Sequence, residues 1–495
     1  MPKYEFDLGV LGGGSAGLTA AAGAARLGAK VLLIEKEAAL GGDCLHFGCV
    51  PSKTLIRTAS VYQAMKNAPR YGLPAAQPGP VDFAQVRARI DEVIRAIEQH
   101  DSVERFCRLG VQVEFGRPRF LDPHQVELDG KKFTARAWVI ATGSSPAAPP
   151  VPGLDKTPYL TNRELFSLEK MPASMIMLGG GPVAIEMAQA FQRLGSQVDV
   201  VQRSGQILSK EDPDMAQGVM EAMEQEGVAF HLESKVLGVR NLGGERELTL
   251  KDKHGAEKTL RAEVLLVALG RTANVEGLGL EAAGVDFSPE GVAVDSRLRT
   301  SQKHIYVAGD ATGSYLFTHA AGYEASVVVA NAVLRLPRRA DYTFLPWCTF
   351  TEPELASIGM NEKAAQEAGR PYKVFIQEFK DNDRSLAEGF DIGRIKLLLG
   401  ERDKPLGVQI LGPHAGELLG EWVAALGGRV KLTTLAGAVH PYPTLGEINQ
   451  RAALNFVEQK YLSARIKKGL KFFFHLKGRA CRADEDAGGQ KSKKG

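Results

Sequence analysis

The sequence predicts an α/β fold, and three observations support this prediction. An apolar run at residues 6–11 leads into Gly-Gly-Gly-Ser-Ala-Gly, an Ala-rich helical stretch and a second apolar run. The same order recurs from residue 175, with Gly-Gly-Gly-Pro-Val-Ala as the turn. Beyond about residue 341, apolar runs and helical stretches alternate without such turns. Strands that alternate with helices are typical of parallel sheets, so we expect two nested Rossmann-like dinucleotide-binding domains plus an α+β domain.

The composition limits the classes of protein that fit. The chain has 495 residues, of which 44% are hydrophobic and 24% charged, enough for two to four globular domains. Its formal net charge of +3 is small, so no nucleic-acid partner is expected. Five scattered cysteines do not form a secreted disulfide framework. No run reaches the ~18 apolar residues of a membrane span, and the first residues lack an apolar signal region. We therefore expect a cytoplasmic protein.

The first Gly-rich turn has the spacing of a dinucleotide site. Gly12, Gly14 and Gly17 occupy the positions of a G-x-G-x-x-G motif. Such glycines allow a tight turn and let a pyrophosphate approach the helix N-terminus, whose unpaired N–H groups favour anions. Glu35, at the end of the second strand, is placed to accept hydrogen bonds from ribose hydroxyls. The alternative is a Gly-rich turn without a ligand.

Two cysteines, Cys44 and Cys49, follow in the segment Gly-Gly-Asp-Cys-Leu-His-Phe-Gly-Cys-Val-Pro-Ser-Lys. On a regular helix their Cα atoms would lie roughly 7.5 Å apart, whereas a disulfide needs about 4.4–6.8 Å. If the two sulfurs bond, the helix start must be distorted, and Gly48 can supply the backbone freedom. A strained disulfide is readily reduced, which indicates a redox-active pair. Two unrelated buried thiols are the alternative.

The second Gly-rich turn repeats the first with one change. Gly179, Gly181 and Ala184 stand in G-x-G-x-x-A positions, and two such units suit an enzyme that passes a hydride between two dinucleotides. A structural repeat without a ligand is the alternative. The second strand ends at Gln202 and Arg203 rather than at an acid, which removes repulsion against a 2′-phosphate. We therefore favour NADPH over NADH.

Two later fragments complete a resemblance to a known family. Residues 138–143 end in Ala-Thr-Gly, and residues 300–310 end in Gly-Asp. With the Gly-rich turn and the Cys-x4-Cys segment, their order over about residues 6–460 resembles the flavin-dependent pyridine nucleotide–disulfide oxidoreductases. That family includes glutathione reductase, dihydrolipoyl dehydrogenase and mercuric reductase. The resemblance implies FAD and NADPH (or NADH) as cofactors, and a homodimer whose α+β domain is the dimerisation domain.

Residue roles follow from the same resemblance. Cys49 is implied as the thiolate beside the flavin and Cys44 as the exchanging thiol. Lys53 is implied to pair with Glu186 near the flavin and to help lower the thiolate pKa. No metal site is expected. The expected cofactor-binding residues are Gly12, Gly14, Ser15, Ala16, Gly17, Glu35, Lys36, Gly42, Lys53, Ala141, Thr142, Gly143, Gly309, Asp310, His319 and Ala320 for FAD, and Gly179, Gly181, Ala184, Gln202, Arg203 and Gly270 for the nicotinamide nucleotide.

Two of these FAD residues carry specific expectations. Asp310 is implied to bond the ribityl or phosphate region of FAD. The helix that starts near Phe317 is implied to point its N-terminus at the flavin pyrimidine, where its dipole would stabilise the anionic reduced flavin. For His319 a solvent-side cap position is the alternative, and we expect its backbone to matter more than its ring.

The segment from His440 to Glu447 departs from the family pattern. Glutathione reductase and dihydrolipoyl dehydrogenase carry His-Pro-Thr-x-x-Glu, in which the Glu orients a His that moves protons across the dimer interface. Here Tyr442 stands five residues before Glu447. A phenol with a pKa of about 10 is a poor base but a serviceable donor. His440 lies two residues further back, roughly 6–7 Å along an extended chain, so both side chains are candidate proton donors.

Mercuric reductases also have a Tyr in this region, so the core resembles that branch. They carry adjacent cysteines near the C-terminus, whereas this chain offers only Cys481 there, and dedicated mercury reduction is not expected. We expect a FAD-dependent NAD(P)H oxidoreductase with a redox-active Cys44–Cys49 disulfide and a small-molecule or disulfide electron acceptor. A dihydrolipoyl dehydrogenase-type activity is the first alternative. Cys348, in an apolar strand-like setting, is expected to be inert.

The C-terminal tail mixes basic and aromatic residues. At helical spacing, Ile466, Leu470, Phe473 and Phe474 gather on one side. A basic amphipathic helix can lie on an anionic membrane. Peripheral contact at the inner membrane surface is therefore one expectation, and a membrane-associated redox partner is the second alternative function. Packing on the dimer competes with both, and residues 484–495 are expected to be disordered.

The expected domain limits follow the order of the motifs. They are 1–150 and 274–341 for the two parts of the FAD-binding domain, 151–273 for the NAD(P)-binding domain, 342–463 for the dimerisation domain and 464–495 for the tail.

Overall fold

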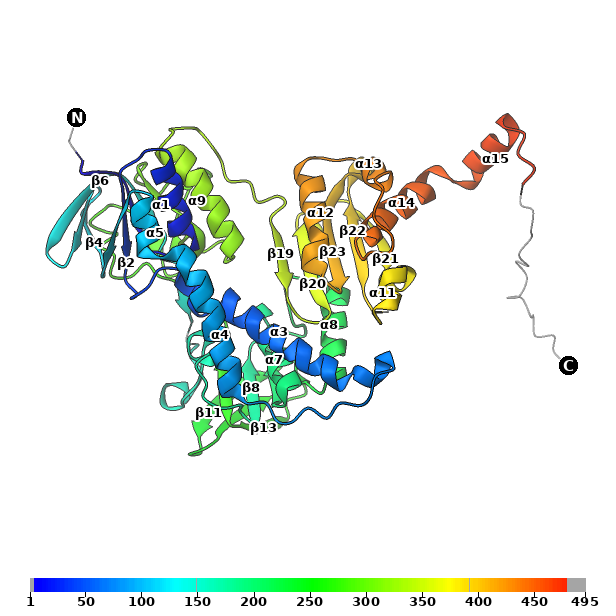
Figure 1. The fold of residues 1–495 in the computed structure, drawn as a ribbon, viewed down its shortest axis with the longest axis horizontal. Helices are drawn as coiled ribbons and strands as arrows, with labels where there is room; N and C mark the ends of the chain where they lie inside the picture. The colour runs from blue at the N-terminus through cyan, green and yellow to red at the C-terminus, as the bar shows by residue number, and fades with distance from the viewer. Residues whose placement is uncertain (1–3, 148, 391, 479–495) are drawn as a thin grey trace.

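The computed structural model describes residues 4–147, 149–390 and 392–478. The chain forms three packed α/β bodies, and helix α15 projects from the last of them (Figure 1). Helices α3 (Cys49–Lys66) and α4 (Phe83–Glu98) run from the first body along the second. The expected disorder of residues 484–495 and the isolated Cys481 lie outside the described residues.

The first body is a sheet in which β6 (Lys131–Ile140) belongs to two pairing patterns. Its N-terminal half pairs antiparallel with β5, and its C-terminal half lies parallel between β1 and β18. Burial changes at the same point, from alternating positions to a continuous buried run over residues 137–140, as expected for a strand covered on both faces. The strands are β1 (Phe6–Leu11), β2 (Val31–Glu35), β3 (Val111–Phe115), β4 (Arg119–Asp122), β5 (Gln125–Leu128) and β18 (Ile305–Val307).

Helices α1 (Ser15–Arg26) and α9 (Thr318–Ala332) pack against each other on this sheet. Small side chains such as Ala20, Ala24 and Ala325 are fully buried there, so the two helices approach closely. The expected strand at 300–310 is formed only over Ile305–Val307, because the residues before it make turns. Smaller elements are α5 (Val103–Arg108), β16 (Phe287–Ser288), β17 (Gly291–Val292), η1 (Ala68–Tyr71), η2 (Gln99–Asp101) and η4 (Gly309–Thr312).

The second body repeats the parallel arrangement. Its parallel sheet has the order β10-β9-β8-β14. A separate antiparallel sheet, β11-β12-β13, is formed by the segment between β10 and β14. The chain enters and leaves through β7 (Ser144–Pro146) and β15 (Arg271–Ala273), which pair as an antiparallel ribbon. The elements are β8 (Ser174–Leu178), β9 (Gln197–Val201), β10 (Ala229–His231), β11 (Lys235–Asn241), β12 (Arg246–Lys251), β13 (Glu257–Ala262), β14 (Val264–Val267), α6 (Asn162–Leu165), α7 (Pro182–Leu194), α8 (Pro213–Gln225) and η3 (Leu154–Lys156).

The third body is an antiparallel sheet of order β19-β20-β23-β22-β21. Trp422 on α12 is buried against it and donates from Nε1 to Asn449 Oδ1 at 2.8 Å, which ties α12 to α14. The elements are β19 (Pro346–Thr349), β20 (Glu354–Gly359), β21 (Lys373–Glu378), β22 (Arg394–Leu399), β23 (Pro405–Gly412), α10 (Glu362–Glu367), α11 (Asp383–Ala387), α12 (Ala415–Gly427), α13 (Leu432–Ala436), α14 (Glu447–Tyr461), η5 (Phe379–Asp381) and η6 (Glu401–Asp403).

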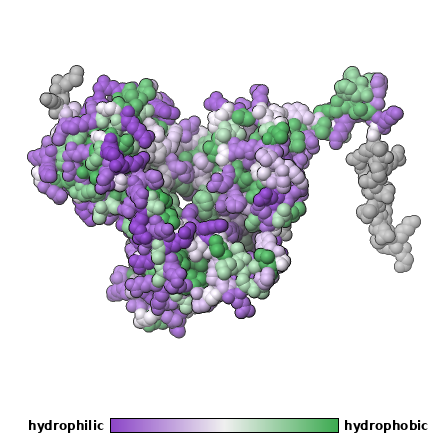
Figure 2. Space-filling model, in the orientation of Figure 1, coloured by the Kyte–Doolittle hydropathy of each residue, from purple (hydrophilic) through white to green (hydrophobic). Residues whose placement is uncertain are grey.

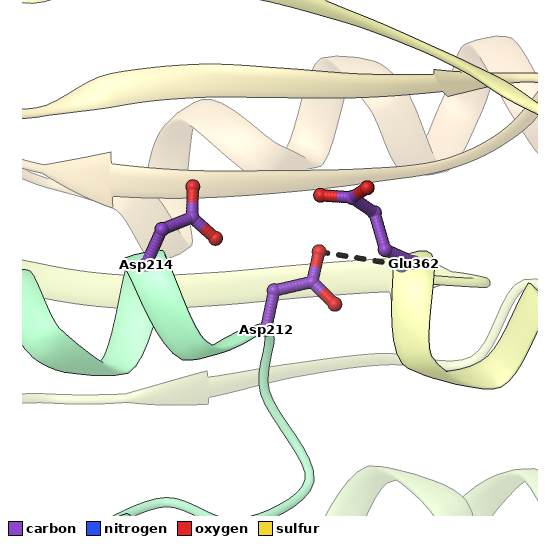
Figure 3. A group of neighbouring side chains, drawn as sticks. All are labelled: Asp212, Asp214 and Glu362. Atoms are coloured by element: carbon purple, nitrogen blue, oxygen red, sulfur yellow. Dashed lines mark hydrogen bonds between the residues drawn. The ribbon is translucent and has the colours of Figure 1, made fainter. Parts of the chain in front are cut away.

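A charge cluster around the buried Lys396 and Asp212 joins the second and third bodies. Asp212, Asp214 and Glu362 turn their carboxylates toward a common centre (Figure 3). The Lys396 ammonium lies 3.0 Å from Asp212, 2.7 Å from Asp214 and 2.5 Å from Glu362. The lysine therefore supplies a cation to the three convergent carboxylates. We call these four residues the interdomain lock.

Helix α15 (Ala464–Phe473) leaves the third body and has no buried residue. Ser463 caps it by accepting from Ile466 N at 3.4 Å. Figure 2 shows hydrophobic and hydrophilic residues side by side on this projection, and Phe472, Phe473 and Phe474 are each at least two-thirds exposed. Within the described ranges, none of the helices has the length and apolar character needed to cross a bilayer.

Candidate active site

The two cysteines lie on separate helices, which corrects the expectation of one distorted helix start. Cys44 is in α2 (Gly42–His46) and Cys49 opens α3. Gly48 lies between them with negative φ, so it does not provide left-handed freedom. Its lack of a side chain matters instead, because a Cβ there would lie 2.9 Å from Asp43 O and 3.3 Å from Cys44 Cα. Neither cysteine forms a disulfide here.

The environment of the pair favours a thiolate on Cys49. The hydrogen bond from the Cys44 thiol lowers the pKa of Cys49 to about 6 against the opposing effect of burial, with help from Thr318 and from the charge of Lys53. Thr318 Oγ1, at the N-terminus of α9, lies 3.4 Å from Cys49 Sγ. The hydrogen bond with Cys49 raises the pKa of Cys44, as does burial, and Thr318 opposes this rise. One thiol of the pair is thus a nucleophile near neutral pH and the other a hydrogen-bond donor.

Lys53 is one turn along α3 from Cys49, and its partner is fixed. Its Nζ donates to Glu186 Oε2 at 2.7 Å, and it also lies 4.5 Å from the Phe350 ring centroid. Glu186, on α7, is buried and accepts from Phe350 N at 2.9 Å. The pair therefore joins the redox helix to the second and third bodies. A lysine held in this way remains charged near Cys49.

The first Gly-rich turn has the backbone openings that FAD requires. Gly12 has φ of 108°, and a Cβ would meet Ala141 O at 2.3 Å. A Cβ on Gly17 would lie 1.8 Å from Gly12 O, and one on Gly42 would lie 2.7 Å from Gly14 Cα. Glycine at these positions leaves the N-terminus of α1 open to a pyrophosphate. Ser15 and Ala16 form the first turn of that helix.

Glu35 is oriented by the turn itself. It is buried, and its carboxylate accepts from Gly13 N at 2.5 Å and from Glu37 N at 2.7 Å. The carboxylate stands at the end of β2, where a ribose is expected. The neighbouring Lys36 is exposed, and its ammonium lies 4.0 Å from Glu37.

Asp310 lies in a polar group at the carboxyl end of the first sheet. Burial raises its pKa, opposed by the hydrogen bond from Ser144 and the charge of Arg271. Ser144 Oγ donates to Asp310 Oδ2 at 2.5 Å, and Arg271 Nε lies 3.7 Å away. Gly309 precedes it, and Ala141, Thr142 and Gly143 follow the adjacent strand β6, so these expected FAD residues gather at one edge. His319 and Ala320 are in the first turn of α9, and the His319 ring bonds to Pro346 O at 2.7 Å.

The second Gly-rich turn is more open. Gly179 has φ of 114° and abuts Ala268 O, but a Cβ on Gly181 or Gly270 would meet nothing within 4 Å. Ala184 is buried in α7. Gln202 occupies the place that Glu35 has in the first unit: its Oε1 accepts from Gly180 N at 3.1 Å and its Nε2 donates to Ser204 Oγ at 2.7 Å. Arg203 beside it is exposed.

Tyr442 and Glu447 do not contact one another through a hydrogen bond in the chain. The Tyr442 hydroxyl donates to Asp383 Oδ2 at 2.9 Å, and the side chain is 68% exposed. Glu447 Oε1 accepts from Arg451 at 3.1 Å, four residues further along α14. His440 is engaged elsewhere, with Nε2 2.9 Å from Glu421 Oε1. Within one chain, the acid that contacts His440 is Glu421 rather than Glu447.

The sequence analysis did not identify the residues that contact the turn between Cys44 and Cys49, which we call the redox turn. Asp43 accepts from Asn162 Nδ2 at 3.2 Å and from Arg271 Nη2 at 3.0 Å. Asp43 was visible as an acid beside Cys44, but its partners are 119 and 228 residues away. Burial and neighbouring carboxylates raise the pKa of Cys348.

These features define a class of protein: a flavin- and nicotinamide-dependent oxidoreductase with a cysteine pair beside the flavin site. The family model "Pyridine nucleotide-disulphide oxidoreductase" matches residues 6–325, and the model of its dimerisation domain matches residues 345–453. The chain belongs to the pyridine nucleotide-disulphide oxidoreductase family. Its members use FAD and NAD(P)H, so the expected cofactors, fold class and enzyme class are confirmed.

Proteins with sequences similar to this chain include enzymes of two types. The chain is 31% identical to a mercuric reductase of Staphylococcus aureus over 454 residues, which cover 91% of this chain and 82% of the relative. It is 33% identical to a dihydrolipoyl dehydrogenase of Bacillus subtilis over 464 residues, which cover 91% and 99%. The fold matches the flavoprotein disulfide reductase RclA of Escherichia coli with a TM-score of 0.80 at 24% identity, covering 92% of this chain and all of that one.

Proposed function

We propose that this enzyme uses NADPH to reduce a Cys44–Cys49 disulfide and that the resulting dithiol reduces a disulfide-type or other small acceptor. The observation that carries the proposal is the surroundings of Cys49, where a neighbouring thiol, the Thr318 hydroxyl and the Lys53 charge all favour the thiolate. When bound, FAD supplies the route by which a hydride equivalent from the nicotinamide reaches the disulfide.

The electron balance assigns a role to each cysteine. One NADPH and one proton provide the two electrons and two protons that convert the disulfide to two thiols. Cys44 is the exchanging thiol: its sulfur attacks one sulfur of an acceptor disulfide and forms a mixed disulfide. The acceptor S–S bond breaks in this step, and the first acceptor half leaves as a thiol with the proton that Cys44 gives up. The Cys49 thiolate then attacks Cys44, which closes the internal disulfide and releases the reduced acceptor. Lys53, held by Glu186, keeps a positive charge beside the Cys49 sulfur throughout.

Protons for this exchange are proposed to come from Tyr442 of the partner subunit in a homodimer. The family's dimerisation domain supports the dimer, and Tyr442 is solvent-exposed in the single chain. Its hydrogen bond to Asp383 raises the pKa of the phenol, so it acts as a donor and not as a base. His440, held by Glu421, is the alternative donor. A dihydrolipoyl dehydrogenase-type activity is the competing function, favoured by the relative that is 33% identical.

The decisive experiment compares the native enzyme with Cys44→Ser. Initial rates are measured with NADPH and with NADH against dihydrolipoamide, glutathione disulfide, quinones, Hg(II) and Cu(II). We expect NADPH to be the better donor and Cys44→Ser to lose turnover of the disulfide-type acceptor while retaining bound FAD. Full turnover of every acceptor in Cys44→Ser would show that the pair is not used, and a strong NADH preference would overturn the choice of nicotinamide.

A second proposal concerns location: α15 lies on the surface of an anionic membrane. The segment from residue 464 to residue 478 carries Arg465, Lys467, Lys468, Lys471 and Lys477 and no acid. Its Phe side chains are exposed in the chain. Basic charge and apolar area on one short helix are what binding to anionic lipid requires.

Flotation with vesicles tests this location. Full-length protein should float with phosphatidylglycerol vesicles and not with phosphatidylcholine vesicles, and a chain truncated after Leu462 should float with neither. Equal behaviour of the two chains would contradict the membrane contact and favour packing of α15 on the dimer.

A further inference from the structure

The turn between Cys44 and Cys49 is held by a polar cluster that the reaction above does not use. Asp43 Oδ2 accepts from Arg271 Nη2 at 3.0 Å, and the two Asp43 oxygens lie 3.2 and 3.4 Å from Asn162 Nδ2. The same Asn162 amide donates to Phe47 O at 2.9 Å. One amide group therefore binds the turn on both sides, at the residue before Cys44 and at the residue before Gly48.

Helix α2 has few other anchors. It has five residues and no side-chain cap at its N-terminus. The Asp43 side chain links α2 to Asn162 and Arg271, and the Cys44 thiol contacts Cys49 and Thr318. His46 bonds to the nearby Leu40 O. Because Cys44 and Cys49 are on different helices, no helical repeat fixes the distance between their sulfurs. The contacts of α2 set that distance.

The anchors come from the connection between the two nucleotide-binding bodies. Arg271 opens β15 and donates from Nε to Ser144 Oγ at 2.6 Å, on the paired strand β7. Ser144 in turn donates to Asp310, an expected FAD residue. Asn162 opens α6, where the chain enters the second body. The redox turn is thus attached to the ribbon that joins the two bodies.

We propose that Asp43, anchored by Asn162 and Arg271, is a positioning residue that holds the Cys44 thiol within hydrogen-bonding distance of Cys49. This proposal rests on the redox role proposed for the pair. It deepens that role by assigning the reactivity of Cys49 in part to residues that touch neither sulfur.

Losing the Asp43 charge and displacing the Cys44 thiol are expected to shift the pKa of Cys49 in opposite directions, so the two effects can be distinguished. The charged groups that face Cys49 are Lys53 on its own helix and Glu186 on α7, with the Cys44 thiol from α2. Removing the Asp43 carboxylate would, by charge alone, favour the thiolate and lower the pKa of Cys49. Loss of the Cys44 hydrogen bond would raise it, because that bond has the largest lowering effect. Asn162→Ala changes no charge and should raise the pKa by position alone.

The experiment follows alkylation of Cys49 by iodoacetamide in the reduced, FAD-containing enzyme over a pH series centred on about 6, the pKa of Cys49. We expect Asn162→Ala and Asp43→Ala to move the midpoint up by about one pH unit, which means about tenfold slower alkylation below the midpoint. Asp43→Asn retains an oxygen for Arg271 and should move it less. Asp155→Ala, at an exposed aspartate in η3, is the matched control and should leave the midpoint unchanged.

An unchanged midpoint in Asn162→Ala, or a downward shift in Asp43→Ala, overturns the proposal. If Asp43→Ala does not retain FAD, the charge-neutral Asn162→Ala decides the question. Alkylation requires no electron acceptor, so an enzyme that fails every acceptor assay still reports on the position of Cys44. Failure of the proposed function and failure of this proposal are therefore distinguishable.

Discussion

The two Gly-rich units share a fold but differ in how tightly they enclose their turn. Gly12 and Gly179 have nearly the same backbone, with φ of 108° and 114°, and each abuts a carbonyl oxygen of the following strand connection. The first turn is then closed by Gly42 of α2, whereas nothing lies within 4 Å of a Cβ on Gly181. The closed unit suits a cofactor that stays bound, and the open unit suits a nucleotide that enters and leaves in each turnover.

The strand ends differ in the same sense. Glu35 uses both carboxylate oxygens on backbone N–H groups of its own turn. The Gln202 Oε1 atom accepts one such bond, from Gly180 N, and its Nε2 donates to the Ser204 hydroxyl. A neutral amide holds the turn while leaving the place of a 2′-phosphate free of negative charge. About nine residues after Glu35, the first unit contains Cys44. About ten residues after Gln202, the second unit contains Asp212, which belongs to the interdomain lock.

The largest expected effect is at the third glycine position. In Gly17→Ala the new methyl would lie 1.8 Å from Gly12 O, so the turn must shift and FAD should be lost. The matched change Ala184→Gly in the second unit removes a methyl and should cost only about 1 kcal/mol of stability. Flavin absorbance per chain and thermal unfolding measure both. Full FAD occupancy in Gly17→Ala would show that the two turns are equally tolerant.

The next effect is on the lock that follows the second unit. Lys396→Met leaves Asp212, Asp214 and Glu362 without their shared cation, and Asp212 is 1% exposed. We expect the free energy of unfolding to fall by about 3–5 kcal/mol. Lys373→Met is the control: Lys373 is exposed and pairs with Asp403 at 3.6 Å, a contact worth less than about 1 kcal/mol. If chemical denaturation gave the same loss of unfolding free energy for both variants, the interdomain lock would contribute no more to stability than an exposed ion pair.

The smallest effect tests the strand ends. Gln202→Glu gives the second unit the acid of the first, and its carboxylate would repel a 2′-phosphate. The KM for NADPH should rise about tenfold, or about 1.4 kcal/mol, while the KM for NADH stays within a factor of two to three. Initial rates with both nucleotides check this. An equal rise in the KM for NADPH and for NADH would mean that Gln202 stabilises the turn but does not discriminate between the two nucleotides by the 2′-phosphate.

Local patterns were sufficient to predict both units and the cysteine pair. Apolar runs, glycine spacing and the strand-end residues are all contained within about 30 residues, so the sequence reveals them directly. The pairing of Lys53 with Glu186 came from the family resemblance, and the two side chains do meet at 2.7 Å. The roles of the individual site residues and the domain limits stay predictions.

Contacts between distant segments were not predictable in this way. The break between α2 and α3 depends on a close backbone approach at Gly48 and on partners of Asp43 far away in the chain. Lys396 looks like an exposed lysine in Arg-Ile-Lys-Leu-Leu-Leu, but the neighbouring body makes it buried. The pairing of Glu447 with Arg451, four residues apart, is a new contact that helical spacing could have indicated.

The interdomain contacts also bear on the order in which the chain is made. Asp212 and Arg193 belong to the second body, yet their partners Lys396 and Glu352 are synthesised more than 150 residues later. A nascent chain that ends before the third body would carry Asp212 without Lys396, and Arg193 with Glu226 as a partner but without Glu352. These interdomain ion pairs can therefore form only after the residues of the third body have been synthesised.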